Sequence, residues 1–234
     1  MERGQIDIAH AVAQHQAYEE MLAGFGVRLE RLPALPDLPD GMFVEDPAVV
    51  LDEVAIIGRL GVESRRQEVE TVAEALAQYR PLRRIDPPGT LEGGDVMVAG
   101  RSLYVGVSSR TNLAGIGQLE DIVRPLGYRV HPVPVHGCLH LKTACSYLGS
   151  GAVFVNREWL DASALEGLRL IDVREPWAAN VLGIGDIVLM AAGFPASERS
   201  VREAGFQVDT LDVSELMKAE AGLTCMSLLF EGRC

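Results

Sequence analysis

The chain has 234 residues, of which 48% are hydrophobic and 23% charged, and its formal net charge is −12. This length and composition suit a soluble globular protein with a large core. The negative charge and the absence of a basic stripe argue against nucleic acid and against an anionic membrane surface as partners. No apolar run reaches the roughly 18 residues of a membrane span, and no signal peptide is evident. The sequence therefore predicts a cytoplasmic protein whose four cysteines are reduced thiols.

Taken in chain order, the pattern begins with an amphipathic helix over about residues 6–23 and a strand over 27–32. After that, one pattern recurs about every 40 to 50 residues, a spacing typical of repeat architectures. Each repeat is an apolar hairpin, a helix and a short strand. Ser64 is expected to cap the first repeat's helix, with Gln67 in the reciprocal position. The hairpins are expected at 48–57, 96–106, 145–155 and 181–191, the helices at 64–79, 111–126, 161–167 and 197–204, and the closing strands at 82–85, 128–133, 168–173 and 206–211.

A fifth repeat is expected to be split across the two ends of the chain. Residues 223–230 would give one strand, and the N-terminal helix and the strand at 27–32 would give the rest. One strand is then missing, and it would have preceded Met1. We expect that the chain is truncated, that another chain supplies this edge, or that the fifth repeat is incomplete. No linker separates the repeats, so residues 1–234 are predicted to form one closed ring of α/β units.

Three distant residues supply the parts needed for covalent catalysis. Cys225 offers a thiol nucleophile, His140 a base, and Glu92 a carboxylate that can orient this base. A guanidinium carbon is a poor electrophile, and a thiolate is the side-chain nucleophile best suited to it. An acidic cluster upstream suggests that the target of the thiol is cationic: Asp40, Glu45 and Asp46.

Each of these residues also has an ordinary structural interpretation. A free cysteine is usually a small buried hydrophobe, and a histidine between two leucines is more often a core residue. The acidic cluster could be a solvated loop. The spacing of Cys138, His140 and Cys145 matches no common structural zinc site. Together with Cys234, the two cysteines of that group are therefore interpreted as thiols without a catalytic role.

Five motifs, in this order, resemble the guanidine-modifying superfamily of pentein α/β propellers, and within it the dimethylarginine dimethylaminohydrolase family. They are FVED at 43–46, LEGGDV at 91–96, SRTN at 109–112, LHLK at 139–142 and GLTC at 222–225. The resemblance runs over residues 6–230 and implies five ββαβ units around a pseudo-fivefold axis. Family members usually carry a further strand and a lid loop before the first helix, and both are absent here.

The resemblance also implies a role for each residue of the site. Cys225 would be the nucleophile, His140 the acid and base, and Glu92 its acidic partner. The acidic cluster would surround a guanidinium, while Arg65 and Arg110 would hold the carboxylate at the other end of an arginine-like ligand. Arg66, adjacent to Arg65, is an alternative to it. No metal and no cofactor are expected.

The function implied is hydrolysis of Nω-methylated arginine to citrulline and an alkylamine through a covalent thiouronium. His140 would protonate the departing amine and then deprotonate water. Two alternatives stay open at this point. One is an arginine deiminase-like enzyme or another hydrolase of guanidino or ureido acids, and the other is a non-catalytic pentein binding protein. The family also allows a homodimer.

Overall fold

The computed structural model describes residues 4–232, so Cys234 lies outside the described residues. These residues form two compact units. The larger unit contains residues 32–144, 157–167 and 224–232, and the smaller unit contains residues 4–31, 145–156 and 168–223. Within the described residues, no helix is long and apolar enough to cross a membrane. That the chain forms one domain stays a prediction.

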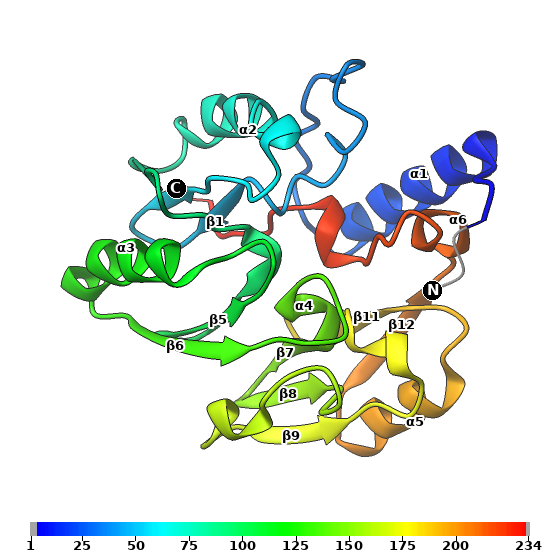
Figure 1. Ribbon diagram of the computed structural model, residues 1–234. Coiled ribbons are helices and arrows are strands. Elements are labelled where there is room, and N and C mark those ends of the chain that lie inside the picture. Colours follow the sequence, from blue (N-terminus) through cyan, green and yellow to red (C-terminus); the bar gives the residue numbers. More distant parts are fainter. Residues whose placement is uncertain (1–3, 233–234) are drawn as a thin grey trace. The chain divides into compact units, whose positions relative to one another are not determined.

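The larger unit contains two three-stranded sheets with the same topology (Figure 1). In each sheet the first two strands form an antiparallel hairpin, and the third strand returns parallel to the second after a helical crossover. These sheets confirm the first two ββαβ repeats. Their elements are β1 (Ala48–Val50), β2 (Ala55–Ile57), α2 (Glu68–Leu76) and β3 (Leu82–Arg84), then β4 (Val96–Ala99), β5 (Ser102–Val107), α3 (Leu113–Val123) and β6 (Arg129–Pro134).

Helical periodicity explains how α2 covers its sheet. Its residues Val69, Val72, Ala73 and Leu76 recur on one face and are buried with Ile57 in one apolar cluster. On α3, the side chain of Asn112 caps the first turn by accepting a hydrogen bond from the Gly115 amide at 2.8 Å. A second cluster joins α3 to its sheet through the fully buried Leu103 and Leu119.

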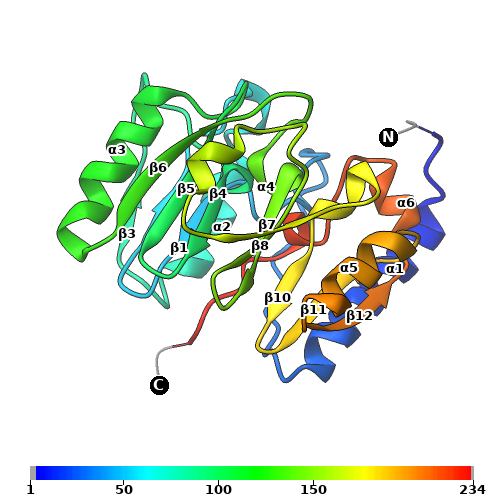
Figure 2. The same cartoon turned by 90° about the horizontal axis from the view of Figure 1, so that it is seen from below.

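The smaller unit repeats the same topology in two further sheets. Again, an antiparallel hairpin is followed by a parallel third strand. Figure 2 shows α5 running alongside β11 and β12. The elements are β7 (Cys145–Gly149), β8 (Ala152–Val155) and β9 (Arg169–Asp172), then β10 (Leu182–Ile184), β11 (Ile187–Ala191), α5 (Pro195–Glu203) and β12 (Gln207–Leu211). The helix expected at 161–167 is a single 3-10 turn, Ala162–Leu165.

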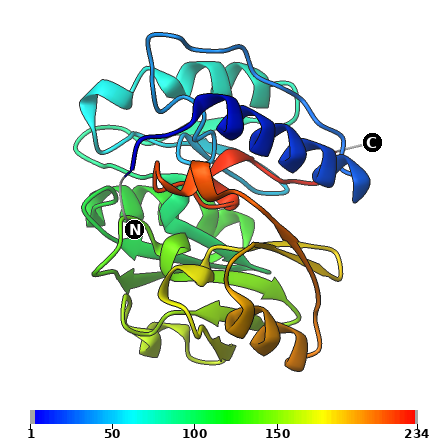
Figure 3. The same cartoon turned by 90° about the vertical axis from the view of Figure 1, so that its right-hand side faces the viewer.

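The N-terminal helix α1 (Ile8–Gly24) confirms the helix expected at 6–23, and it packs on α6 (Ser214–Met217) (Figure 3). Asp7 caps α1 by accepting from the His10 amide at 3.1 Å. Gln14 joins the two helices, because its side chain donates to the Ser214 hydroxyl and accepts from the Glu215 amide.

Two expected strands are wrong. Residues 27–32 form no strand, and in place of a strand at 223–230 the structure has a 3-10 turn, Thr224–Met226. The reason is local: the main chain and side chains of this segment are hydrogen-bonded to Glu45 rather than to a neighbouring strand. The predicted capping box is also wrong, because Ser64 lies in a separate 3-10 turn and α2 begins at Glu68.

Candidate active site

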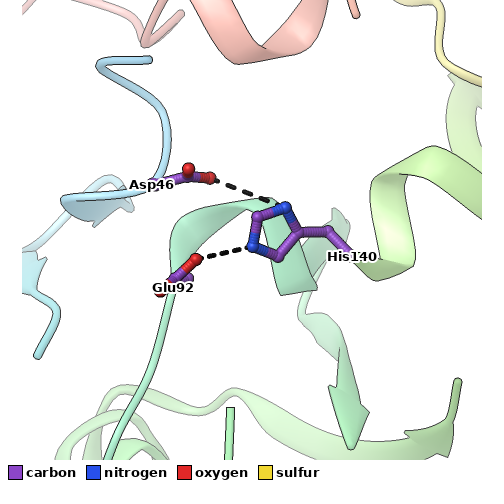
Figure 4. A group of neighbouring side chains, drawn as sticks. All are labelled: Asp46, Glu92 and His140. Carbon is purple, nitrogen blue, oxygen red and sulfur yellow. Dashed lines mark hydrogen bonds and ion pairs between the residues drawn. The ribbon is translucent and has the colours of Figure 1, made fainter. Parts of the chain in front are cut away.

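The centre of the candidate site is the His140 ring, held between two carboxylates of the larger unit. Glu92 lies in the turn before β4, Asp46 lies just before β1, and His140 precedes the short helix α4 (Leu141–Ala144). Figure 4 shows the two acids approaching opposite nitrogens of the ring. Nε2 is 2.6 Å from Glu92 Oε2, and Nδ1 is 3.9 Å from Asp46 Oδ1. All three side chains are buried.

Glycine at position 94 makes this approach possible. A Cβ atom on Gly94 would lie 2.7 Å from Asp46 Oδ1 and 2.9 Å from the His140 ring. Gly93 is equally confined, because a Cβ there would overlap the carbonyl oxygens of Glu45 and Ala48. Only residues without a side chain therefore allow the turn after Glu92 to pack against the two other members of the site.

The electrostatic environment keeps His140 charged. Burial by itself lowers the pKa of His140, but the negative charges of Asp46, Glu92 and Asp95 outweigh burial and raise the pKa to about 9. Burial raises the pKa of Glu92, and the hydrogen bond from His140 with its charge reverses this, so the pKa is lowered. The pair is therefore an imidazolium and a carboxylate at neutral pH.

The contacts of the ring assign different tasks to its two nitrogens. An ionised carboxylate can only accept hydrogen bonds, so Nε2–H donates to Glu92. Glu92 is itself fixed, because its other oxygen accepts from the Gly61 amide at 2.9 Å. Nδ1 is consequently the nitrogen that can exchange a proton with another molecule.

Two buried polar atoms of the described residues have no hydrogen-bond partner: Asp46 Oδ1 and Arg110 Nη1. Buried polar groups are nearly always hydrogen-bonded, and exceptions often mark places where a ligand binds. Arg110 Nη1 lies 3.8 Å from Glu92 Oε1, beside the same cluster. One acceptor and one donor are thus available near His140.

Arg65 lies among acids. It is buried, donates to Asp46 Oδ2 at 2.8 Å and to Glu68 Oε2 at 2.8 Å, and has the half-exposed Asp40 at 3.7 Å. Arg66 points elsewhere, with a hydrogen bond to the Leu60 carbonyl. The roles predicted for Arg65 and Asp40 at opposite ends of a ligand stay predictions.

The segment that carries Cys225 is bonded to Glu45. The Glu45 amide donates to the Cys225 carbonyl at 3.3 Å, and Thr224 Oγ1 donates to Glu45 Oε2 at 2.7 Å. Lys142 Nζ forms a very short ion pair with Glu45 Oε1. Because Asp46 follows Glu45 directly, the half-buried Cys225 belongs to the same neighbourhood as the histidine pair.

Sequence reasoning missed four residues of this site. Besides Lys142 and Thr224, the buried Asp95 accepts from the Leu141 amide at 2.9 Å and from the Ser108 hydroxyl at 2.6 Å. It therefore fixes the residue next to His140. Burial raises the pKa of Asp95. The signal was present, since Asp95 and Lys142 belong to the motifs LEGGDV and LHLK.

Asp46, Glu92 and His140 also offer one ligand atom each within 4.8 Å of one another. This spacing could accommodate a metal ion. However, the two carboxylates approach opposite nitrogens of the ring, so an ion bound to one nitrogen would meet one carboxylate and lie away from the other. A protonated imidazole between two acids fits this geometry better.

Comparison with known proteins identifies the family. The model of the arginine deiminase family matches residues 29–176. N(G),N(G)-dimethylarginine dimethylaminohydrolase of Pseudomonas aeruginosa is 36% identical over 231 residues, which cover 97% of this chain and 91% of that protein. The chain belongs to the arginine deiminase family. The protein of the same name from Streptomyces coelicolor is 39% identical over 230 residues, 97% of this chain and 89% of its own.

Solved structures agree with this family and confirm the expected pentein-type α/β fold. A dimethylarginine dimethylaminohydrolase adduct with S-methyl-L-thiocitrulline matches with a TM-score of 0.93 at 35% identity, covering 98% of this chain and 92% of that one. A cysteine-to-serine mutant of the Pseudomonas aeruginosa enzyme, complexed with citrulline, matches with a TM-score of 0.91 at 34% identity, covering 98% and 92%. The resemblance to the dimethylarginine dimethylaminohydrolase family is thereby confirmed.

Proposed function

We propose that this protein is a hydrolase that cleaves the guanidinium C–N bond of Nω-methylated arginine and yields citrulline and an alkylamine. The observation that carries the proposal is Asp46 Oδ1, a buried oxygen without a hydrogen-bond partner that faces Nδ1 of His140. A planar guanidinium offers the N–H donors that such an oxygen requires. The relatives named dimethylarginine dimethylaminohydrolase support the same substrate class.

The chemistry proceeds in two halves. The Cys225 thiolate attacks the guanidinium carbon, a C–S bond forms, and the methylated nitrogen leaves with a proton from Nδ1 of His140. The thiouronium that remains is attacked by water, whose proton returns to Nδ1. The C–S bond then breaks and releases citrulline and the thiolate. Glu92 keeps Nε2 engaged throughout, so the same nitrogen gives and takes the proton. No step uses a cofactor or a metal.

Recognition of the amino-acid end is assigned to Arg110. Its Nη1 is a buried donor without a hydrogen-bond partner, and a substrate carboxylate can accept from it. Arg65 is a second predicted carboxylate ligand, and Asp40 a further acid beside the guanidinium. At present Arg65 is paired with Asp46 and Glu68, so its part in binding requires that it exchange partners.

A second candidate is hydrolysis of arginine itself, because the matching family model is that of arginine deiminase. Both reactions give citrulline, and they differ in the amine released. Ammonia from arginine would favour the deiminase, and methylamine or dimethylamine from methylated arginines would favour our first proposal.

The deciding experiment incubates the protein with arginine, Nω-methylarginine and asymmetric Nω,Nω-dimethylarginine, and measures citrulline and the amine by chromatography. A Cys225→Ser variant is the matched control. We expect turnover of methylated arginine, and an acid-quenched sample should carry the thiouronium on the peptide that contains Cys225. Turnover that persists in the serine variant would refute the mechanism, and an inert, unlabelled thiol would favour a binding protein.

Several features of the protein's setting stay predictions. They are a small arginine-like ligand rather than nucleic acid or membrane as partner, a cytoplasmic location, a single domain over residues 1–234 and a homodimer.

A further inference from the structure

We infer that Glu45 is a positioning residue that, together with Lys142 and Thr224, holds the Cys225 thiol in place for attack. The inference rests on the proposed function, because it takes Cys225 as the nucleophile. The contacts that carry it do not involve the substrate.

Glu45 holds two consecutive residues of the nucleophile segment. Its amide donates to the Cys225 carbonyl, and its Oε2 accepts the Thr224 hydroxyl. Glu45 and Thr224 are each 5% exposed, so this contact is shielded from water. A main-chain bond and a side-chain bond to neighbouring residues fix both the position and the rotation of the peptide that bears the thiol.

Lys142 connects this arrangement to the acid–base residue. It follows His140 by two residues in the chain, and its ammonium group is paired with Glu45 Oε1. A buried carboxylate is costly without a countercharge, and burial indeed raises the pKa of Glu45 while Lys142 opposes that rise. One carboxylate therefore joins the segment carrying the thiol to the segment carrying the imidazole.

This arrangement differs from the substrate contact that the family resemblance predicts for Glu45. Both of its oxygens already have partners, whereas the neighbouring Asp46 has an oxygen without one. The two roles have different kinetic consequences. Loss of a substrate ligand raises KM, whereas displacement of a nucleophile lowers kcat and changes the reactivity of the free thiol.

The test compares Thr224→Val, which removes the hydroxyl with little change in shape, with Thr224→Ser, which retains it. Glu45→Gln is the third variant. Lys218→Met is the matched control, because it removes a similar lysine–carboxylate pair, Lys218 with Glu215 at 2.7 Å, in the smaller unit. For each variant, kcat and KM are measured with Nω-methylarginine. The rate at which iodoacetamide alkylates Cys225 without substrate is measured from about pH 6 to pH 9.

We expect Thr224→Val and Glu45→Gln to lower kcat by about 10- to 100-fold with KM within about 2-fold, because small displacements of a reacting group are costly. Their alkylation profiles should shift to higher pH, since a displaced thiol is farther from the charged His140. Thr224→Ser and Lys218→Met should behave like the parent protein.

Two results would overturn the inference. A Glu45→Gln variant with raised KM and unchanged kcat would make Glu45 a substrate ligand. A Thr224→Val variant with parental kcat and a parental alkylation profile would make the hydroxyl contact irrelevant to the thiol. If the parent protein turned over none of the arginines, the proposed function would fail, and the alkylation profiles would still decide whether Glu45 and Thr224 position Cys225.

Discussion

Replacing Glu92 with glutamine should change how the stability of this protein depends on pH. The folded-state pKa of His140 is about 9, against an ordinary value of 6.5. That difference corresponds to about 3 kcal/mol of stability. Asp46 and Asp95 also raise this pKa, so we expect Glu92 to account for about 2 kcal/mol of it.

The sign follows from proton linkage. Because the pKa of His140 is raised on folding, its contribution is complete below pH 6.5 and is lost as pH rises through about 9. Glu92 has a lowered pKa and stays ionised over this window. The parent protein should therefore be more stable than Glu92→Gln by about 2 kcal/mol near pH 6, and this gap should largely close by pH 9.

Urea unfolding of both proteins near pH 6, 7.5 and 9 measures the gap. Glu175→Gln is a suitable control: Glu175 accepts hydrogen bonds from the Ala196 and Ser197 amides and has no histidine among those partners. Its effect on the free energy of unfolding should be the same at all three pH values. A Glu92→Gln effect that is equally independent of pH would refute the assignment of a charged, carboxylate-stabilised His140.

Three further changes test the remaining parts of the site. Asp46→Asn removes the charge that faces the proposed guanidinium, so KM for Nω-methylarginine should rise at least about 10-fold, measured by steady-state kinetics. Arg110→Lys keeps the charge but loses the planar fork, and a similar rise in KM is expected, whereas an unchanged KM would exclude Arg110 as the carboxylate ligand. Gly94→Ala places a methyl group against Asp46 and His140 and should lower the free energy of unfolding by about 1–3 kcal/mol. Gly117→Ala, on the open face of α3, should instead raise it by about 0.5–1 kcal/mol; equal effects of the two substitutions would contradict the packing argument.

The four complete repeats could be predicted because each hairpin carries its own local signals. Apolar runs of strand length are interrupted by glycines with positive φ, such as Gly100 between β4 and β5 and Gly185 between β10 and β11. These signals depend only on neighbouring residues, so sequence alone places the turns.

The expected fifth repeat failed because its apolar residues are buried without pairing as strands. Leu228 and Phe230 pack against the cluster that contains Ile57, and the preceding Thr224 is bonded to Glu45, 179 residues away in the chain. An apolar run of this length is compatible with a strand or with a buried loop. Only the distant hydrogen-bond partner decides between them.

The same distinction explains the candidate site. Cys225, His140 and Glu92 were found because their chemistry is visible one residue at a time. The positioning residues Asp95 and Thr224 were missed, because a carboxylate that holds an amide or a hydroxyl that holds a carboxylate is defined only by long-range contacts. Arg65 was predicted to bind a carboxylate ligand, and the structure provides it with carboxylates of this chain, Asp46 and Glu68.

The charge balance around His140 links binding to catalysis in the proposed mechanism. Asp46, Glu92 and Asp95 together hold the imidazolium, which raises its pKa to about 9, and an acid this weak is a poor donor to a departing amine. A guanidinium bound to Asp46 brings a positive charge beside Nδ1 and engages the carboxylate that has the largest share in raising this pKa. Substrate binding therefore makes His140 a stronger acid when the proton is needed, and departure of the amine removes that positive charge before water has to be deprotonated. Without substrate the imidazolium stays charged beside the proposed nucleophile, which favours the thiolate that attacks first.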